Sequence, residues 1–236
     1  MLAYLLMLIK IGHRGAGKEI PENTIASFNA ALDAGMDAVE LDVRRTKDGK
    51  LVVFHDEKMK RLTGAGGSIG DYTLSELEKM RVLGSDYSIP TFDEVLDAVG
   101  DKAKSILIEI KEVGTEKAVI NTVKKHRLAG KVIIVSFHEE ALKTLKELDK
   151  GIITGLIYAS YKSSIYNNPI DAAKALGAEY LLPLYRFTHT KNVEDAHKNG
   201  LKVIVWTIDN REAAKEFKNK GVDGIATDYP EILEGL

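Results

Sequence analysis

Short apolar runs and amphipathic segments alternate along most of the chain. Nine runs rich in Val, Ile and Leu have the length of strands, at residues 8–12, 38–44, 51–54, 105–110, 132–136, 152–157, 180–183, 202–206 and 224–227. Helical segments separate most of them, and a glycine often stands where a helix should end, at Gly35, Gly177, Gly200 and Gly221. Buried strands that alternate with helices predict βα units and a parallel sheet.

One of the nine runs does not fit a parallel arrangement. Asp48-Gly49 lies between the runs 38–44 and 51–54, and this dipeptide between two strands is a strong hairpin signal. We therefore expect residues 51–54 to pair antiparallel with the strand before them, which leaves eight parallel strands. Eight βα units in a chain of 236 residues predict a (β/α)8 TIM barrel. A doubly wound open sheet is the alternative.

The segment after the hairpin strand is too long for an ordinary connection. Residues 56–90 contain the glycine-rich stretch TGAGGS, and capping-box patterns begin at Thr73 and Thr91. We interpret residues 56–90 as a small insertion, at one mouth of the barrel, after the hairpin strand that ends at His55. No linker-like stretch marks a boundary, so residues 1–236 are expected to form a single barrel domain.

Charged residues occupy alternate positions in two predicted strands. In the second strand the apolar side chains fall on one face and Glu40 and Asp42 on the other, and Glu109 alternates with isoleucine in the same way. Because the apolar face meets the helices, these carboxylates point inward, where charge is costly unless it is paired or bound to a metal. An all-oxygen cluster suits Mg²⁺ or Ca²⁺, with Mn²⁺ also possible. The alternative is a set of internal salt bridges with Arg44 and Lys111.

Two histidines stand at strand ends beside this predicted cluster. His13 ends the first strand, at the C-terminal mouth where barrel enzymes have their active sites. His55 ends the hairpin strand, and a turn at 47–49 is expected to place it roughly opposite Asp42. Imidazoles that flank a metal site suit acid–base catalysis, each typically worth about 10²–10⁴ in rate.

The remaining charges indicate a phosphate at the same mouth. Arg14 and Lys111, together with a metal, concentrate positive charge where a phosphate group is bound and transferred. The formal net charge of −2 and the lack of a basic stripe argue against a nucleic-acid partner. The sequence thus favours a small phosphoester as substrate.

The composition of the chain also indicates the cellular compartment. The chain has no Cys, which excludes disulfides and thiolate metal sites and fits a reducing, cytoplasmic location. The apolar start MLAYLLMLIK is too short to span a membrane and lacks the features of a signal peptide. We interpret it as the first strand with a short N-terminal extension and expect no stable membrane insertion. Nothing in the sequence indicates the oligomeric state.

The motifs that carry these residues resemble those of the glycerophosphodiester phosphodiesterase family. Within residues 13–56 the chain reads HRG, PENT, ELDV, DG and VVFHD, and LIEIK, VSF, VWTIDN and GIATDYP follow in that order. The resemblance runs from about residue 11 to the C-terminus. It implies a barrel with an inserted segment, and metal-dependent hydrolysis of a glycerophosphodiester to glycerol phosphate and an alcohol.

The resemblance also implies a role for each matching residue. It implies that His13 and His55 form an acid–base pair. Glu40, Asp42 and Glu109 would be ligands of a divalent cation, and Arg14 and Lys111 would contact the phosphate. Trp206 would form a wall of the substrate pocket, and Glu22 and Asn23 would support the site near the metal or its waters. One departure is His138, which follows VSF where the family commonly has Asp, at a position expected to start a helix.

Several alternatives stay open at this point. The same site could act on a lipid, as a lysophospholipase-D-like or phosphoinositide-lyase-like enzyme. A barrel isomerase or aldolase would also hold phosphate but would not need a metal, and a non-catalytic binding protein would not need the two histidines. The sequence leaves open whether the nucleophile is water or a neighbouring hydroxyl of the glycerol, and which histidine is the acid.

Overall fold

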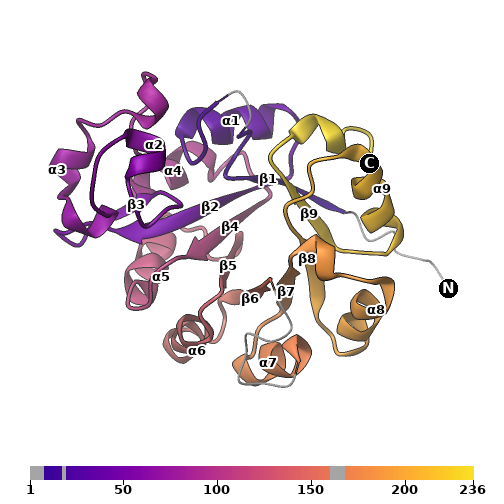
Figure 1. Cartoon of the computed structure of the whole chain (residues 1–236). Helices are drawn as coiled ribbons and strands as arrows, with labels where there is room; N and C mark the ends of the chain where they lie inside the picture. Colours follow the sequence, from indigo (N-terminus) through magenta and orange to yellow (C-terminus); the bar gives the residue numbers. More distant parts are fainter. Residues whose placement is uncertain (1–7, 18–19, 160–167) are drawn as a thin grey trace.

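Parallel strands form a closed barrel in the computed structural model, which describes residues 8–17, 20–159 and 168–236 (Figure 1). The strands are β1 (Ile9–His13), β2 (Ala38–Arg45), β3 (Leu51–Val53), β4 (Ser105–Ile110), β5 (Val132–Ser136), β6 (Ile153–Tyr158), β7 (Tyr180–Pro183), β8 (Lys202–Val205) and β9 (Gly224–Thr227). β1 pairs in parallel with both β9 and β2, which closes the barrel, and β3 alone is antiparallel among the described strands. The predicted (β/α)8 TIM barrel is confirmed.

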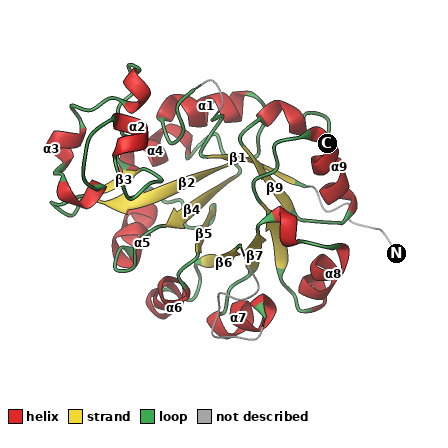
Figure 2. Cartoon of the chain, in the orientation of Figure 1, coloured by secondary structure: helices red, strands yellow, loops and turns green. Residues whose placement is uncertain are grey.

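Helices surround the barrel on its outer side (Figure 2). They are α1 (Ile25–Asp33), α4 (Phe92–Val99), α5 (Glu116–Lys125), α6 (Glu139–Leu148), α7 (Pro169–Leu176), α8 (Thr190–Lys198) and α9 (Arg211–Asn219), with short 3-10 turns η3 (Tyr185–Phe187) and η4 (Pro230–Leu233). The four glycines predicted to end helices have φ between 68° and 84°. No described helix is long and apolar enough to cross a membrane.

The barrel buries two apolar layers. The outer layer lies between strands and helices, and Val39, Leu41 and Val43 of β2 belong to it, as their alternation predicts. The inner layer fills the barrel itself and contains side chains such as Leu107 and Ile133. The side chains of Glu40 and Asp42, which alternate with these residues in β2, therefore point into the barrel.

The hairpin forms as predicted, but its register differs by one residue from the expected one. Asp42 lies opposite Phe54, whose backbone N–H donates to the carbonyl oxygen of Asp42 at 2.9 Å, so His55 lies one residue further on. The turn at 47–49 itself forms as expected, with the N–H of Thr46 donating to the carbonyl oxygen of Lys50 at 2.9 Å, and pairing counted outward from these two residues reaches Phe54 opposite Asp42. Three residues separate Thr46 from Lys50, and this spacing fixes the register of the other residue pairs of the hairpin.

The chain between β3 and α4 forms a small layer of its own beside the hairpin. It contains α2 (Lys60–Thr63), η1 (Ile69–Asp71), α3 (Leu74–Leu77) and η2 (Val82–Gly84), at the upper left of Figure 1. Met59, Leu62 and Leu77 pack on Val52 and Phe54 in an apolar cluster separate from the barrel core. The capping boxes at Thr73 and Thr91 are both present. Residues 1–7 of the expected N-terminal extension lie outside the described residues.

Helix α1 packs very closely against the loop that follows β1. Gly15 has a φ of +95°, and a Cβ atom at this position would lie 2.6 Å from the backbone carbon of Ser27. The N–H of Ala16 donates to the carbonyl oxygen of Ser27 at 3.1 Å. The loop that carries Arg14 is therefore held on the first turn of α1.

We expect Gly15→Ala to lower the free energy of unfolding by about 2–4 kcal/mol, because positive φ strain adds to a backbone overlap. Gly49→Ala is the matched control, since Gly49 has a φ of +79° but nothing lies within 4 Å of the place that its Cβ atom would take. Its loss should be about 1 kcal/mol. Urea unfolding of both variants measures the difference, and equal losses would show that the close approach to α1 is not a constraint.

Candidate active site at the barrel mouth

Three carboxylates meet inside the mouth of the barrel. Glu40 and Asp42 come from β2 and Glu109 from β4, and the strand register places Asp42 directly beside Glu109. Their exposed fractions are 6%, 0% and 8%, and one oxygen atom from each lies within 4.8 Å of the others. The arrangement follows from the alternation of charged and apolar residues in the two strands.

The crowding of these groups changes their acidity. Burial and the negative charge of Asp42 raise the pKa of Glu40 to about 8 and that of Glu109 to about 7. Burial also opposes ionisation of Asp42, but the charges of Lys111 and Arg14 lower its pKa below the ordinary value. Lys111 and Arg14 therefore stabilise the ionised form of Asp42, whereas the ionised forms of Glu40 and Glu109 are not fully compensated by positive charge.

The oxygen atoms of Asp42 fit a metal ligand. Its Oδ2 accepts a hydrogen bond from Nδ2 of Asn23 at 2.7 Å, whereas its buried Oδ1 accepts none. The Nζ of Lys111 lies 3.4 Å from that Oδ1. A buried carboxylate oxygen that accepts no hydrogen bond, beside two further carboxylates, matches the all-oxygen donor set of a hard divalent cation. The cluster of Glu40, Asp42 and Glu109 could thus hold such an ion.

Internal salt bridges account for only part of this charge. Lys111 donates from Nζ to Oε1 of Glu109 at 2.7 Å. Arg44 turns away from the cluster, because its guanidinium donates to the carbonyl oxygen of His55 at 2.8 and 2.9 Å and to Glu112 at 2.9 Å. Lys111 therefore forms a salt bridge within the cluster, as one of the alternatives predicted, whereas Arg44 holds the backbone at His55.

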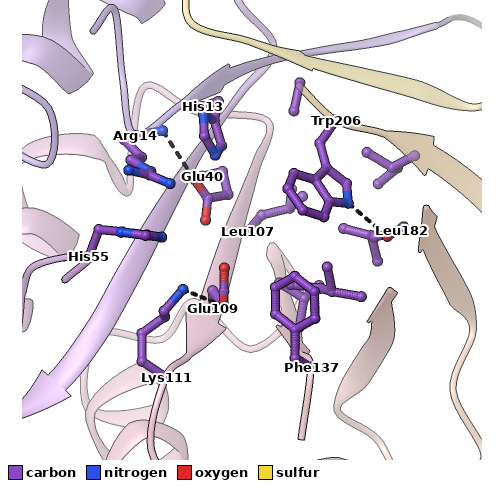
Figure 3. Close-up of a pocket in the computed structure, with 14 residues that line it drawn as sticks. His13, Arg14, Glu40, His55, Leu107, Glu109, Lys111, Phe137, Leu182 and Trp206 are labelled. Atoms are coloured by element: carbon purple, nitrogen blue, oxygen red, sulfur yellow. Dashed lines mark hydrogen bonds and ion pairs between the residues drawn. The ribbon is translucent and has the colours of Figure 1, made fainter. Parts of the chain in front are cut away.

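Both histidines are backed by a carboxylate. The Nδ1–H of His13 donates to Oδ1 of Asp228 at 2.7 Å, and the Nδ1–H of His55 donates to Oδ1 of Asp56 at 2.7 Å. Such a partner fixes the tautomer and the orientation of the ring. Both imidazoles line the same pocket (Figure 3), and Nε2 is the nitrogen that each has free for chemistry.

The surroundings move the two histidine pKa values in opposite directions. Burial lowers the pKa of His13, but the hydrogen bond to Asp228 and the charge of Glu40 outweigh it, so the pKa lies above 6.5. Burial also lowers the pKa of His55, and the charge of Asp42 recovers only part of that shift, so the pKa stays below 6.5. His13 is therefore the more basic of the two histidines.

Arg14 joins several of these groups through its backbone and side chain. Its φ is +56°, and its N–H donates to Oε2 of Glu40 at 3.0 Å. Its Nη1 donates to Oε1 of Glu22 at 2.9 Å, while its buried Nε donates to no acceptor and lies 3.6 Å from Oδ2 of Asp42. Glu22 thus contacts Arg14 rather than the carboxylate cluster. Arg14 also lines the pocket, where the charge of its guanidinium suits a phosphate oxygen.

The opposite wall of the pocket is apolar. Trp206 donates from Nε1 to the carbonyl oxygen of Leu182 at 2.8 Å, and its ring meets Phe137 edge to face at 5.7 Å between centroids (Figure 3). Phe137 is 41% exposed. The pocket has a volume of about 290 Å³, with the charged residues on one side and side chains from the inner barrel layer, including Ile157, on the other.

The structure brings nine of the predicted site residues to one mouth, with Glu22 just behind Arg14. Sequence reasoning missed Asp56, Asp228, Arg61 and Phe137 as partners, although the first, second and fourth lie within the quoted motifs VVFHD, GIATDYP and VSF. His138 caps the start of α6, as expected. The adjacency of a histidine and an aspartate in VVFHD was the available signal for Asp56.

Comparison with known proteins gives a consistent family. The model of the glycerophosphoryl diester phosphodiesterase family matches residues 13–232. A glycerophosphodiester phosphodiesterase of Caldanaerobacter subterraneus subsp. tengcongensis is 38% identical over 237 residues, which cover 96% of this chain and 96% of that protein.

Two solved structures extend the similarity to the fold. A glycerophosphodiester phosphodiesterase from Thermotoga maritima is 35% identical with a TM-score of 0.82, over 95% of this chain and 96% of that one. An Oleispira antarctica phosphodiesterase in complex with the product sn-glycerol-3-phosphate is 28% identical with a TM-score of 0.85, over 94% and 93%. The chain therefore belongs to the glycerophosphoryl diester phosphodiesterase family.

Proposed function

We propose that the chain hydrolyses glycerophosphodiesters to glycerol phosphate and an alcohol, with a divalent cation held by Glu40, Asp42 and Glu109. Mg²⁺ and Ca²⁺ are the cations that this all-oxygen set favours, and Mn²⁺ also fits. The observation that carries the proposal is the carboxylate cluster, in which the buried Oδ1 of Asp42 accepts no hydrogen bond, beside two carboxylate-backed histidines. The glycerol phosphate bound to the Oleispira antarctica relative supports the choice of product.

The residues of the pocket divide the work of phosphoryl transfer. Arg14 and Lys111 bind the phosphate oxygens and offset their charge. A bound divalent cation would polarise the phosphoryl group as a Lewis acid. His55, the less basic of the two, takes the proton of the attacking hydroxyl at Nε2, and His13, the more basic, gives its Nε2 proton to the departing alkoxide. Attack by water completes the hydrolysis with these two transfers, whereas attack by the neighbouring glycerol hydroxyl would give a cyclic phosphate that water then opens with the two histidine roles reversed.

His13→Ala and His55→Ala should each lower kcat/KM by about 10²–10⁴-fold, because each removes one proton transfer. The assay is release of glycerol phosphate from several diesters, with and without EDTA, followed by addition of each divalent cation. His189→Ala is the control, since His189 caps α8 and does not line the pocket. Full activity in EDTA would favour a metal-independent barrel enzyme, and no turnover by the wild type would favour a binding protein.

The pH dependence of kcat/KM should be bell-shaped. Activity falls on the acid side as His55 takes up a proton, below 6.5, and on the alkaline side as His13 loses its proton, above 6.5. Measured on the residual activity of the variants, His55→Ala should lack the acid limb and His13→Ala the alkaline limb. If His55→Ala instead lacked the alkaline limb and His13→Ala the acid limb, the assignment of His55 as base and His13 as acid would be reversed.

A lipid substrate is the second candidate, and the apolar pocket wall favours it. Phe137 is exposed at the mouth and continues the surface of Trp206 and the inner barrel layer. An acyl chain attached to the glycerol could lie along this wall, whereas the polar half would hold the phosphate. Such a substrate would make the enzyme lysophospholipase-D-like without any change in the charged groups.

A comparison of lysophosphatidylcholine with glycerophosphocholine separates the two candidates. If the acyl chain lies along the apolar wall, Phe137→Ala should lower kcat/KM for the lysophospholipid about 10-fold and leave glycerophosphocholine nearly unchanged. Release of choline from both substrates gives the same readout for each. Preference for glycerophosphocholine, with equal effects of the substitution on both, would exclude a lipid subsite at Phe137.

A further inference from the structure

Arg61 lies outside the barrel, yet its guanidinium contacts two carboxylates that support the site. The residue belongs to α2, and its side chain is 47% exposed. It donates to Asp56 from Nε at 2.5 Å and from Nη2 at 3.0 Å. It donates to Glu22 from Nη1 and Nη2, both at 2.8 Å. Every nitrogen of the guanidinium is used, in two bidentate contacts, and the residue does not line the pocket.

Each of these carboxylates holds a different residue of the pocket. Asp56 accepts the Nδ1–H of His55 at 2.7 Å, and Glu22 accepts Nη1 of Arg14 at 2.9 Å. Arg14 follows β1 and His55 follows the hairpin strand, so the two reach the pocket from separate parts of the chain. Arg61 is the guanidinium, among the described residues, that joins their two supports.

The contacts of Arg61 are separable from the folding of its own segment. Leu62, the next residue, is buried in the apolar cluster that attaches residues 56–90 to the hairpin, together with Met59 and Ile69. A partly exposed ion pair contributes little to global stability. The segment should therefore stay in place when Arg61 is replaced, while the orientations of Asp56 and Glu22 are lost.

We propose that Arg61 is a positioning residue for the reaction, an inference that rests on the proposed function. It orients His55 through Asp56 and Arg14 through Glu22, and so couples the proton-transfer group to the phosphate contact. Residues 56–90 thereby complete the site from outside the barrel. Loss of such an outer partner typically costs about 10–100-fold in activity.

Arg61→Met keeps the length of the side chain and removes both bidentate contacts. We expect kcat to fall about 10–100-fold and KM to rise, with an unchanged melting temperature. Asp56→Asn should lower mainly kcat, and Glu22→Gln should raise mainly KM. The double variant Arg61→Met/Asp56→Asn should have the kcat of Asp56→Asn alone, because both changes remove the same support. Arg61→Lys should not restore activity, since an ammonium cannot make two bidentate contacts.

Arg81→Met is the matched control. Arg81 lies in the same segment, and its guanidinium contacts the backbone carbonyl oxygens of Glu78 and Met80 and no carboxylate. Wild-type kinetics for this variant would support the inference. A loss that Arg81→Met reproduces, or one that accompanies a fall in melting temperature, would overturn it, as would unchanged kcat and KM in Arg61→Met.

A second measurement does not need substrate. Imidazole ¹H–¹⁵N spectra, assigned with His13→Ala and His55→Ala, report the Nδ1 hydrogen bond of each histidine. In Arg61→Met the Nδ1 signal of His55 should shift or broaden, while that of His13, bonded to Asp228, should not. Unchanged signals from both would overturn the inference. An inactive wild type with the expected spectral change would instead contradict the proposed function alone.

Discussion

The mouth of this barrel is organised by one electrostatic constraint, which is that three carboxylates are buried side by side. Glu40, Asp42 and Glu109 lie on neighbouring strands and point into a space that water cannot freely solvate. Buried like charges are tolerated only with compensating positive charge or hydrogen bonds. Lys111 and Arg14 provide part of that compensation, and the raised pKa values of two carboxylates show that more is needed. A cluster with this deficit of positive charge could hold a cation.

The two histidines are held by structures of different kinds. His13 is bonded to Asp228, which directly follows the barrel strand β9, and the N–H of Asp228 donates to Oδ1 of Asp209 at 3.0 Å. His55 depends on the hairpin, on Arg44 at its carbonyl oxygen and on Asp56 at its ring. One imidazole is therefore fixed by the closed barrel and the other by charged contacts at its edge.

The sequence predicted the parts of the site that depend on periodicity, and less of what depends on loop paths. Alternation in β2 and β4 was enough to place Glu40, Asp42 and Glu109 together, because parallel register and side-chain direction follow from strand geometry. The hairpin turn at 47–49 was also predicted correctly, but the expected partner of Asp42 was off by one residue, because pairing counted outward from Thr46 and Lys50 reaches Phe54 rather than His55. The roles of Asp228 and Arg61 depend on three-dimensional loop conformation, which no local pattern encodes. The single-domain organisation, the insertion at 56–90 and the cytoplasmic location stay predictions.

The division of the pocket into a charged wall and an apolar wall follows from the same barrel geometry. Strands β2 and β4 bring charged side chains to the interior, whereas β5 to β9 bring Val135, Ile157 and Ile204 among others. Because the low-dielectric wall faces the charged one, it would strengthen the proposed interaction of Arg14 and Lys111 with a phosphate group. Among the described residues, the charged side chains that line the pocket all lie on the other side. The groups proposed for the reaction therefore lie on the β1–β4 side of the mouth, and the described part of the opposite side offers apolar contacts to the rest of the substrate.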